Sequence, residues 1–405
     1  MNAGLFCPSL PVTPVRPYRL RGRSAFTLVE LMISITILVI LMLVVTQVIG
    51  IVQRNWVRSN ARVSQFREAR VAFDTLTRNI SQATLNTYWE SASDPFRTDA
   101  AGQQVTRARA NVRQSELQFV CGPTTRLLTS ASGSKENYPG HAVFFQAPLG
   151  VTRLVAATGS QANTENMVNL LCGRGYFVEW GDDQPYRPPF LNQLTSVPPR
   201  FRLRLMEYSP TSEMNRIYSD GFRLIDPNDR TKIVNSRRWF QEALTTTVQS
   251  SETVDSRAFT RPIAENILTL VISPRIETTV ASSSGNIEPF SIAREYEFDS
   301  TLVTSPGSSA GSSPQGTQHQ MPPLLLVTMV ALDQRGGESL SSNNDLRQKV
   351  LAETSTLFTN AADYAADLEG TAEEPGKLKK ILLENKLDYR VFTTTIALKQ
   401  ARWSF

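Results

Sequence analysis

The most prominent feature of the chain is a long apolar run near its start. From Phe26 to Val52 the chain is almost entirely apolar, and the one charged side chain within the run is the carboxylate of Glu30. An α-helix rises about 1.5 Å per residue, so a helix over residues 26–52 can cross a hydrocarbon core of roughly 30 Å. The pattern therefore predicts a membrane-spanning helix. A carboxylate inside such a segment is costly, so Glu30 needs a partner or a functional reason.

The helical pattern continues beyond the apolar run, but it becomes amphipathic. Apolar residues recur there at spacings of three and four, which keeps them on one face of a helix. These residues are Phe66, Ala69, Phe73, Leu76, Ile80 and Ala83. Arginines and an aspartate occupy much of the remaining surface. We expect one helix from Phe26 to about Leu85, with an amphipathic half within residues 53–90 that packs its apolar face on a β-sheet.

From Ser91 onward the pattern favours a β-rich head over residues 91–405. Short runs rich in β-branched and aromatic residues predict strands: Leu117–Cys121, Ala142–Gln146, Tyr176–Trp180, Phe201–Tyr208, Ile267–Ile276, Leu324–Leu332 and Tyr389–Leu398. Helical patterns return at Ser236–Leu244, Asp345–Asn360 and Pro375–Asn385. Residues 91–114 and 122–140 are polar and predict loops. The Ser/Gly/Pro tract 304–319 predicts a flexible loop. The fold class expected is α+β.

The charge balance argues against a nucleic-acid-binding protein. Lys and Arg number 42 against 37 Asp and Glu. Four arginines lie before the apolar run without any acid, and without them the count is 38 against 37. The remainder is nearly neutral, whereas a nucleic-acid-binding body should present a basic face.

Cysteines and histidines are few. Cys7 precedes the apolar run, which leaves Cys121 and Cys172 as a pair suited to a disulfide in an oxidising compartment. Two separate buried thiols are the alternative. His141 and His319 are the only histidines, so a catalytic triad or a metal site has little support, and we expect no enzyme activity, metal or cofactor. Loop carboxylates such as Asp182 and Asp183 leave calcium binding open.

The residues around the start of the apolar run form a recognisable signal. A basic leader, residues 1–25, ends in Ser24-Ala25, and Phe26-Thr27-Leu28-Val29-Glu30 follows. This arrangement resembles the class III signal of type IV pilins and of type II secretion pseudopilins. The resemblance implies that prepilin peptidase cleaves between Ala25 and Phe26 and methylates Phe26. Glu30 would become the fifth residue of the mature chain, within reach of the terminal amine of a neighbouring subunit.

One position departs from the family pattern, since the family prefers glycine before the cleavage point and this chain has Ala25. Alanine is small enough to be tolerated, although cleavage is then expected to be slower. A Sec signal peptide would have a shorter apolar core, followed by its small residues. An uncleaved signal anchor would account for the length but would leave Glu30 without a role.

Three further stretches resemble the J-type minor pseudopilins. They are Phe66–Asn86, Pro262–Leu270 and Met321–Leu332. The family also favours a tryptophan between the last two stretches, and this chain has none there. A large pilin-like protein of the kind encoded in verrucomicrobial and planctomycete gene cassettes fits the length of the chain.

The sequence therefore predicts a structural minor pilin or pseudopilin. Its expected partners are prepilin peptidase, other pilin subunits and the inner membrane, with the N-terminus in the cytoplasm and the head in the periplasm. The alternative is a membrane-anchored periplasmic binding protein or adhesin that does not polymerise.

Overall fold

The chain divides into two compact units, Met1–Asn60 and Ala61–Phe405. The computed structural model describes residues 27–93, 101, 109–128, 138–150, 169–219, 221–226, 232–245, 259–277, 287–304, 315–370 and 374–401. Ala25 and Phe26, the predicted cleavage and methylation positions, lie outside the described residues, as does the rest of the leader.

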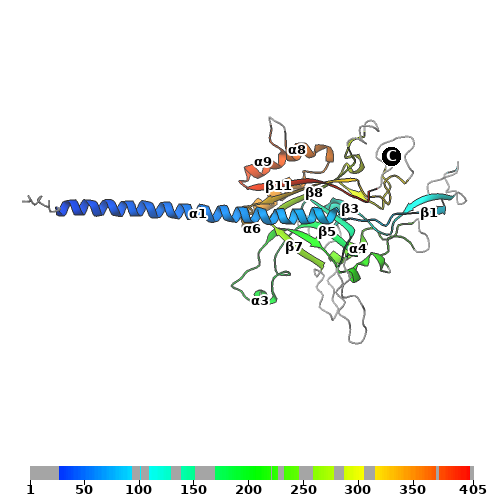
Figure 1. The fold of residues 1–405 in the computed structure, drawn as a ribbon, viewed down its shortest axis with the longest axis horizontal. Coiled ribbons are helices and arrows are strands. Elements are labelled where there is room, and N and C mark those ends of the chain that lie inside the picture. Colours follow the sequence, from blue (N-terminus) through cyan, green and yellow to red (C-terminus); the bar gives the residue numbers. More distant parts are fainter. Residues whose placement is uncertain are drawn as a thin grey trace, which may run out of the picture. The chain divides into compact units, whose positions relative to one another are not determined.

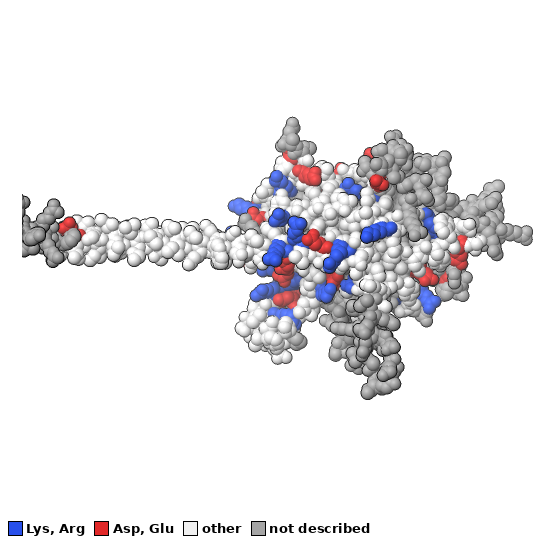
Figure 2. Space-filling model, in the orientation of Figure 1, with Lys and Arg blue, Asp and Glu red and all other residues white. Residues whose placement is uncertain are grey.

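The described part of the first unit is a single helix. Helix α1 runs from Leu28 to Ile80 and continues from the first unit into the second. Its segment Leu28–Val57 is long and apolar enough to cross a membrane, and none of that segment is buried within the protein. The predicted long apolar helix is therefore present. Figure 2 shows this part of α1 free of charged side chains after an acidic group at its start, as the sequence between Glu30 and Arg54 requires.

The second unit is an α+β head with two main antiparallel sheets (Figure 1). The larger sheet has the order β7-β6-β5-β4-β3-β9, with bounds Thr260–Glu265, Arg202–Tyr208, Leu170–Gly181, His141–Gly150, Val120–Pro123 and Phe298–Asp299. The smaller sheet has the order β11-β10-β8, with bounds Tyr389–Ala397, Leu324–Leu332 and Ile267–Arg275. The predicted α+β fold class is confirmed, and each of the predicted strands occurs, β10 with the predicted ends.

Helices surround these sheets. The described ones after α1 are α2 (Thr124–Leu127), α3 (Pro189–Asn192), α4 (Arg238–Thr245), α6 (Gln334–Ser342), α7 (Asn344–Ser355), α8 (Tyr364–Leu368) and α9 (Lys377–Glu384). Helices α4, α7 and α9 correspond to the three predicted helical patterns. Helices α6 and α7 are capped by Asp333 and Asn343, whose side chains accept hydrogen bonds from backbone N–H groups of the first turn.

The C-terminal part of α1 packs on both sheets with the predicted apolar face. Ala69, Leu76 and Ile80 are fully buried, and the ring of Phe73 lies 5.9 Å from that of Phe392 in β11. The helix ends at Ile80, before the predicted Leu85. Residues 88–90, at the end of the predicted amphipathic half 53–90, belong instead to strand β1.

Strand β1 (Tyr88–Ser93) pairs with β2 (Arg109–Gln114) as a hairpin, so the loop predicted over 91–114 is wrong at both ends. A side chain far along the sequence bonds to the backbone of β2. The amide of Gln315 accepts from Arg113 N–H (2.8 Å) and donates to Arg113 O (3.0 Å). The local pattern of polar residues around β2 cannot predict a bond to a residue so far along the chain.

Gln315 belongs to the tract 304–319 that the sequence predicted as a flexible loop. Residues 305–314 lie outside the described residues. At the far end of the tract, Gln315, Thr317 and His319 are buried, and His319 N–H donates to Ser300 O (2.6 Å). This end of the loop is therefore packed against the head.

The chain passes from one sheet to the other at a single residue, Asn266. It has a φ of 57° and separates β7 from β8, which belong to different sheets. Asparagine accepts this left-handed conformation more readily than most residues. A Cβ on Gly337 would lie 1.9 Å from Asn266 Oδ1, so any larger residue at this position of α6 would displace the side chain of Asn266. The stretch Pro262–Leu270, which resembles a stretch of the J-type pseudopilins, thus includes parts of two strands.

Candidate functional site

The start of α1 presents a short polar arrangement formed by Thr27 and Glu30. Thr27 Oγ1 accepts a hydrogen bond from Glu30 N–H (3.3 Å), and Thr27 O accepts from Leu31 N–H (3.1 Å). Thr27 is therefore the N-cap of α1, and Glu30 lies in its first turn, three residues later. The Thr-x-x-Glu spacing is that of a capping box, and an acid in the first turn interacts favourably with the helix dipole.

This geometry gives Glu30 a local role in addition to the role predicted from the resemblance. Thr27 was not predicted as a cap, although the spacing Thr27-Leu28-Val29-Glu30 is the sequence pattern of a capping box. The side chain of Glu30 is exposed in the single chain. It is consequently available to a group outside the chain.

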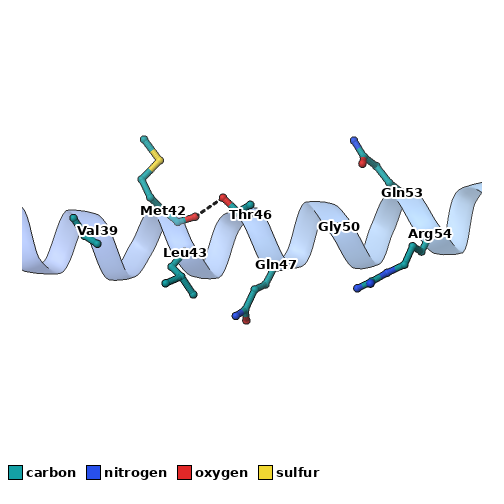
Figure 3. A pocket seen from close by; sticks show the side chains of 8 residues that line it. All are labelled: Val39, Met42, Leu43, Thr46, Gln47, Gly50, Gln53 and Arg54. Atoms are coloured by element: carbon teal, nitrogen blue, oxygen red, sulfur yellow. Dashed lines mark hydrogen bonds between the residues drawn. The ribbon is translucent and has the colours of Figure 1, made fainter.

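Hydroxyl groups within the apolar segment bond to the helix itself. Ser34, Thr36 and Thr46 each donate to a carbonyl of the preceding turn, and the bond from Thr46 Oγ1 to Met42 O (2.8 Å) appears as a dashed line in Figure 3. These bonds satisfy hydroxyls that lipid could not. Figure 3 also shows Gln47, Gly50 and Gln53 farther along the helix surface. Most of the apolar segment Leu28–Val57 is thus suited to an apolar environment.

A hydrogen-bonded chain joins the C-terminal part of α1 to the larger sheet. Asn79 Nδ2 donates to Tyr176 Oη (2.7 Å), and Tyr176 Oη donates to Glu207 Oε1 (2.8 Å). Arg174 and Arg261 pair with the same carboxylate at 3.3 and 2.6 Å. Burial and the Glu207 charge raise the pKa of Tyr176 well above its usual value. These residues were not predicted from the sequence, because they lie far apart along the chain.

Both histidines are in buried structural positions. His141 Nδ1 accepts from Ile272 N–H (3.1 Å), and its Nε2 lies 3.2 Å from Phe358 O. His319 is buried at the far end of the Ser/Gly/Pro tract. Within the described part of the chain, no group of three or more His, Cys, Asp or Glu side chains is placed to hold a metal ion. Asp182 Oδ1 accepts a hydrogen bond from the backbone N–H of Gln184, and Asp183 Oδ1 accepts one from the backbone N–H of Arg200.

The stability of the head should fall in mild acid because of these histidines. Burial lowers the pKa of His141 and of His319 to about 4, from an ordinary value of 6.5. Between these two pH values the unfolded chain binds protons that the folded chain does not. The free energy of unfolding therefore decreases as the pH falls from 6.5 towards 4, by up to about 1.4 kcal/mol per pH unit for each histidine. Urea unfolding at a series of pH values, followed by tryptophan fluorescence, measures this slope.

Carboxylates also titrate in acid, so a variant is needed to measure the contribution of one histidine to this slope. His319 has a φ of 58°, which asparagine tolerates, so His319→Asn should retain the backbone and lose one of the two contributions. Equal slopes for the variant and the parent protein between pH 6.5 and 5 would contradict this assignment.

The two cysteines of the head are free, buried thiols. Cys121 in β3 is paired in register with Val143 of β4, whereas Cys172 in β5 is paired with Ala147 of the same strand. They therefore lie on opposite sides of β4 and four residues apart along it. A disulfide needs Cα atoms within about 7 Å, which this placement precludes. The possible Cys121–Cys172 disulfide is thus corrected to two separate thiols, and burial raises the pKa of both.

The fold and the start of α1 define a protein with one apolar N-terminal helix and an α+β head. Residues 20–46 match the prokaryotic N-terminal methylation motif. Comparison with curated proteins and with solved structures gives no significant match. The chain therefore carries a class III prepilin signal of the type found in type IV pilins and pseudopilins, proteins that are generally structural and not enzymatic. The motif implies processing by prepilin peptidase and agrees with anchoring in the inner membrane.

Proposed function

We propose that this protein is a structural minor pilin or pseudopilin that is assembled into a filament or its tip. The observation that carries the proposal is the methylation motif over residues 20–46, which coincides with the start of an apolar helix. The cleavage point is between Ala25 and Phe26, and Phe26 receives the methyl group. No catalytic residue, metal or cofactor takes part in this function.

Glu30 guides assembly in this proposal. Cleavage creates a positively charged amine on Phe26, and Glu30 of one subunit attracts the amine of the next. The exposed position of Glu30 in the first turn of α1 supports this role. In the low dielectric of a membrane or filament core, the attraction offsets part of the cost of burying the carboxylate. It also favours one register of helix packing over slipped ones.

The placement in the cell follows from the same signal. The basic leader lies in the cytoplasm, α1 crosses the inner membrane, and the head lies in the periplasm until assembly. The apolar segment Leu28–Val57 supports the crossing by its length. Within the class, a J-type minor pseudopilin of type II secretion or a cassette-encoded pilin-like protein fits best, on the resemblance of Phe66–Asn86 and Met321–Leu332.

The N-terminus of protein purified from its native membrane tests the proposal. We expect the intact mass of a chain that begins at Phe26 and carries one methyl group, and N-terminal sequencing should give N-methylphenylalanine. Replacing Ala25 by glycine should speed the processing, because glycine is the residue that the family prefers.

A bulky residue at the same position provides the matched control. Ala25→Leu should leave the leader attached while the chain remains in the membrane. An intact leader on the parent protein would contradict the proposal. The alternative, an anchored periplasmic binding protein or adhesin that does not polymerise, would then be favoured.

A further inference from the structure

The edges of the two sheets differ in how they are protected. An edge strand presents unpaired N–H and C=O groups to which another chain can pair, and proteins usually block such edges with proline, charges, short strands or covering segments. In the larger sheet, edge strand β7 contains Pro262, and Gln65 Nε2 of α1 donates to Glu265 O at its end (3.0 Å). The other edge, β9, is only two residues long.

The smaller sheet has one protected edge, the outer side of β8. There, Ile272 N–H donates to His141 Nδ1 (3.1 Å), and Ile276 N–H, just beyond the strand, donates to Pro289 O (2.7 Å). Gly140 also lies against this strand, since a Cβ on it would come within 2.7 Å of Leu270 O. The start of β4 and the segment near Pro289 therefore cover β8.

Strand β11 is the opposite edge of this sheet, and two flanking bonds define which of its groups point outward. Leu398 N–H donates to Pro323 O, and Asp388 O accepts from Asp333 N–H, both at 3.0 Å. The register between β10 and β11 has no shift. Because successive residues of an antiparallel strand point their backbone groups to opposite sides, even-numbered residues face β10 and odd-numbered residues face away. The outward set is Tyr389, Val391, Thr393, Thr395 and Ala397.

No hydrogen bond to these outward N–H and C=O groups is found across the described ranges of the chain. Thr393, Thr395 and Ala397 are exposed, which agrees with an uncovered edge. The strand (red in Figure 1) is nine residues long, contains no proline, and is uncharged from Val391 to Ala397. Its β-branched and aromatic residues favour an extended partner. None of the devices that protect β7, β8 or β9 is present here.

The charges around β11 indicate what kind of chain can pair with it. Lys386, Arg390 and Lys399 are exposed, and the only acid between residues 386 and 399 is Asp388. The strand is thus bracketed by cations, although the chain without its leader is nearly neutral. A second copy paired antiparallel through β11 would bring the Lys399 end of one strand beside the Lys386 end of the other. Like charges at such positions are unfavourable, whereas acidic residues there are favourable.

We propose that the outer edge of β11 binds an extended, acidic segment of another protein as an additional strand of the smaller sheet. Backbone hydrogen bonds to the odd-numbered residues provide affinity, and acidic side chains at the ends of the added strand pair with the flanking cations. This inference concerns the head alone, and it holds whether or not the protein polymerises.

Hydrogen exchange of the full mature chain in detergent tests the proposal. The probe is the peptide acetyl-Glu-Val-Thr-Val-Thr-Val-Thr-Val-Glu-amide. Without the peptide, the amides of Thr393 and Thr395 should exchange fast, and those of Phe392 and Thr394 should be protected. At a peptide concentration ten times its Kd, exchange at the outward amides should slow about tenfold, because only the unbound fraction exchanges. The same peptide with lysine in place of both glutamates should protect them much less.

Matched variants distinguish strand addition from binding elsewhere. Thr393→Pro removes an outward N–H without removing a bond to β10, and it should abolish the protection at residue 395 by the peptide. Thr393→Ala keeps the N–H, so the peptide should still protect residue 395. If Thr393→Pro does not fold, the peptide with proline in place of its central threonine makes the same test. Equal protection by the two charged peptides, or none by the acidic one, would overturn the proposal. Protection of the outward amides without peptide would also overturn the proposal, because the edge would then already be covered. Sedimentation would show whether the protein is a monomer, whose own chain covers the edge, or a dimer, in which a second copy covers it.

Discussion

Replacing Glu30 by glutamine is expected to abolish incorporation into a filament or tip while the protein stays in the membrane. The substitution removes the charge that attracts the Phe26 amine of a neighbouring subunit. Two unit charges about 4 Å apart interact by about 4 kcal/mol at an effective dielectric of 20, and about 1.4 kcal/mol already corresponds to tenfold in an equilibrium. We therefore expect incorporation to fall more than tenfold, as measured by the amount of the protein in sheared filament fractions relative to membranes.

Glutamine and alanine at this position separate two roles of Glu30. Both variants keep the bond from the backbone N–H of residue 30 to Thr27 Oγ1. Glutamine also suits the third position of a capping box, so Glu30→Gln removes only the charge, whereas Glu30→Ala removes the charge and the side-chain acceptor of the box. If the charge guides assembly, both variants fail. If only the cap matters, Glu30→Gln assembles normally, which would contradict the proposed role. Ser34→Ala, one turn further along α1, is the control and should assemble like the parent protein.

Replacing Leu76 by alanine is expected to cause a large loss of stability in the head. Leu76 is fully buried where the helix packs on the sheets. Leucine-to-alanine changes at such sites cost about 2–5 kcal/mol, because apolar contact is lost and a cavity remains. The midpoint of urea unfolding, followed by the fluorescence of buried Trp239, should decrease accordingly.

The same helix offers a matched control one and a half turns earlier. Val71 is 60% exposed, so Val71→Ala should change the free energy of unfolding by no more than about 0.5 kcal/mol. Similar effects of the two substitutions would mean that this part of α1 does not pack on the sheets as described.

The elements with strong periodicity were predictable because their patterns are local. The apolar run predicted the long apolar helix, the three-and-four spacing predicted the buried face of α1, and the run Leu324–Leu332 predicted β10 with its observed ends. Shorter or more polar elements were not predicted. The hairpin of β1 and β2 and the helix α6 contain few apolar residues, and their position depends on contacts such as Gln315 with Arg113.

For the candidate site, the sequence provided the residues and the structure provided their surroundings. Glu30 was identified from its position in an apolar run and in the FTLVE pentapeptide. The hydrogen bond from Glu30 N–H to Thr27 Oγ1 joins residues three apart, so the Thr-x-x-Glu spacing alone could have predicted it. By contrast, Asn79, Tyr176 and Glu207 come together only when α1 lies on the larger sheet.

By itself, the amino-acid sequence determined the class III signal, the apolar helix behind it and the α+β class of the head, because each depends on residues close together in the chain. Only the tertiary structure decided that Cys121 and Cys172 lie on opposite sides of β4, that His319 is buried, and that Asn266 directs the chain from one sheet to the other. It also decided which strands form the edges and which of them are covered. The physical reason is that strand order and register bring together residues more than a hundred positions apart, and no local pattern records those pairings.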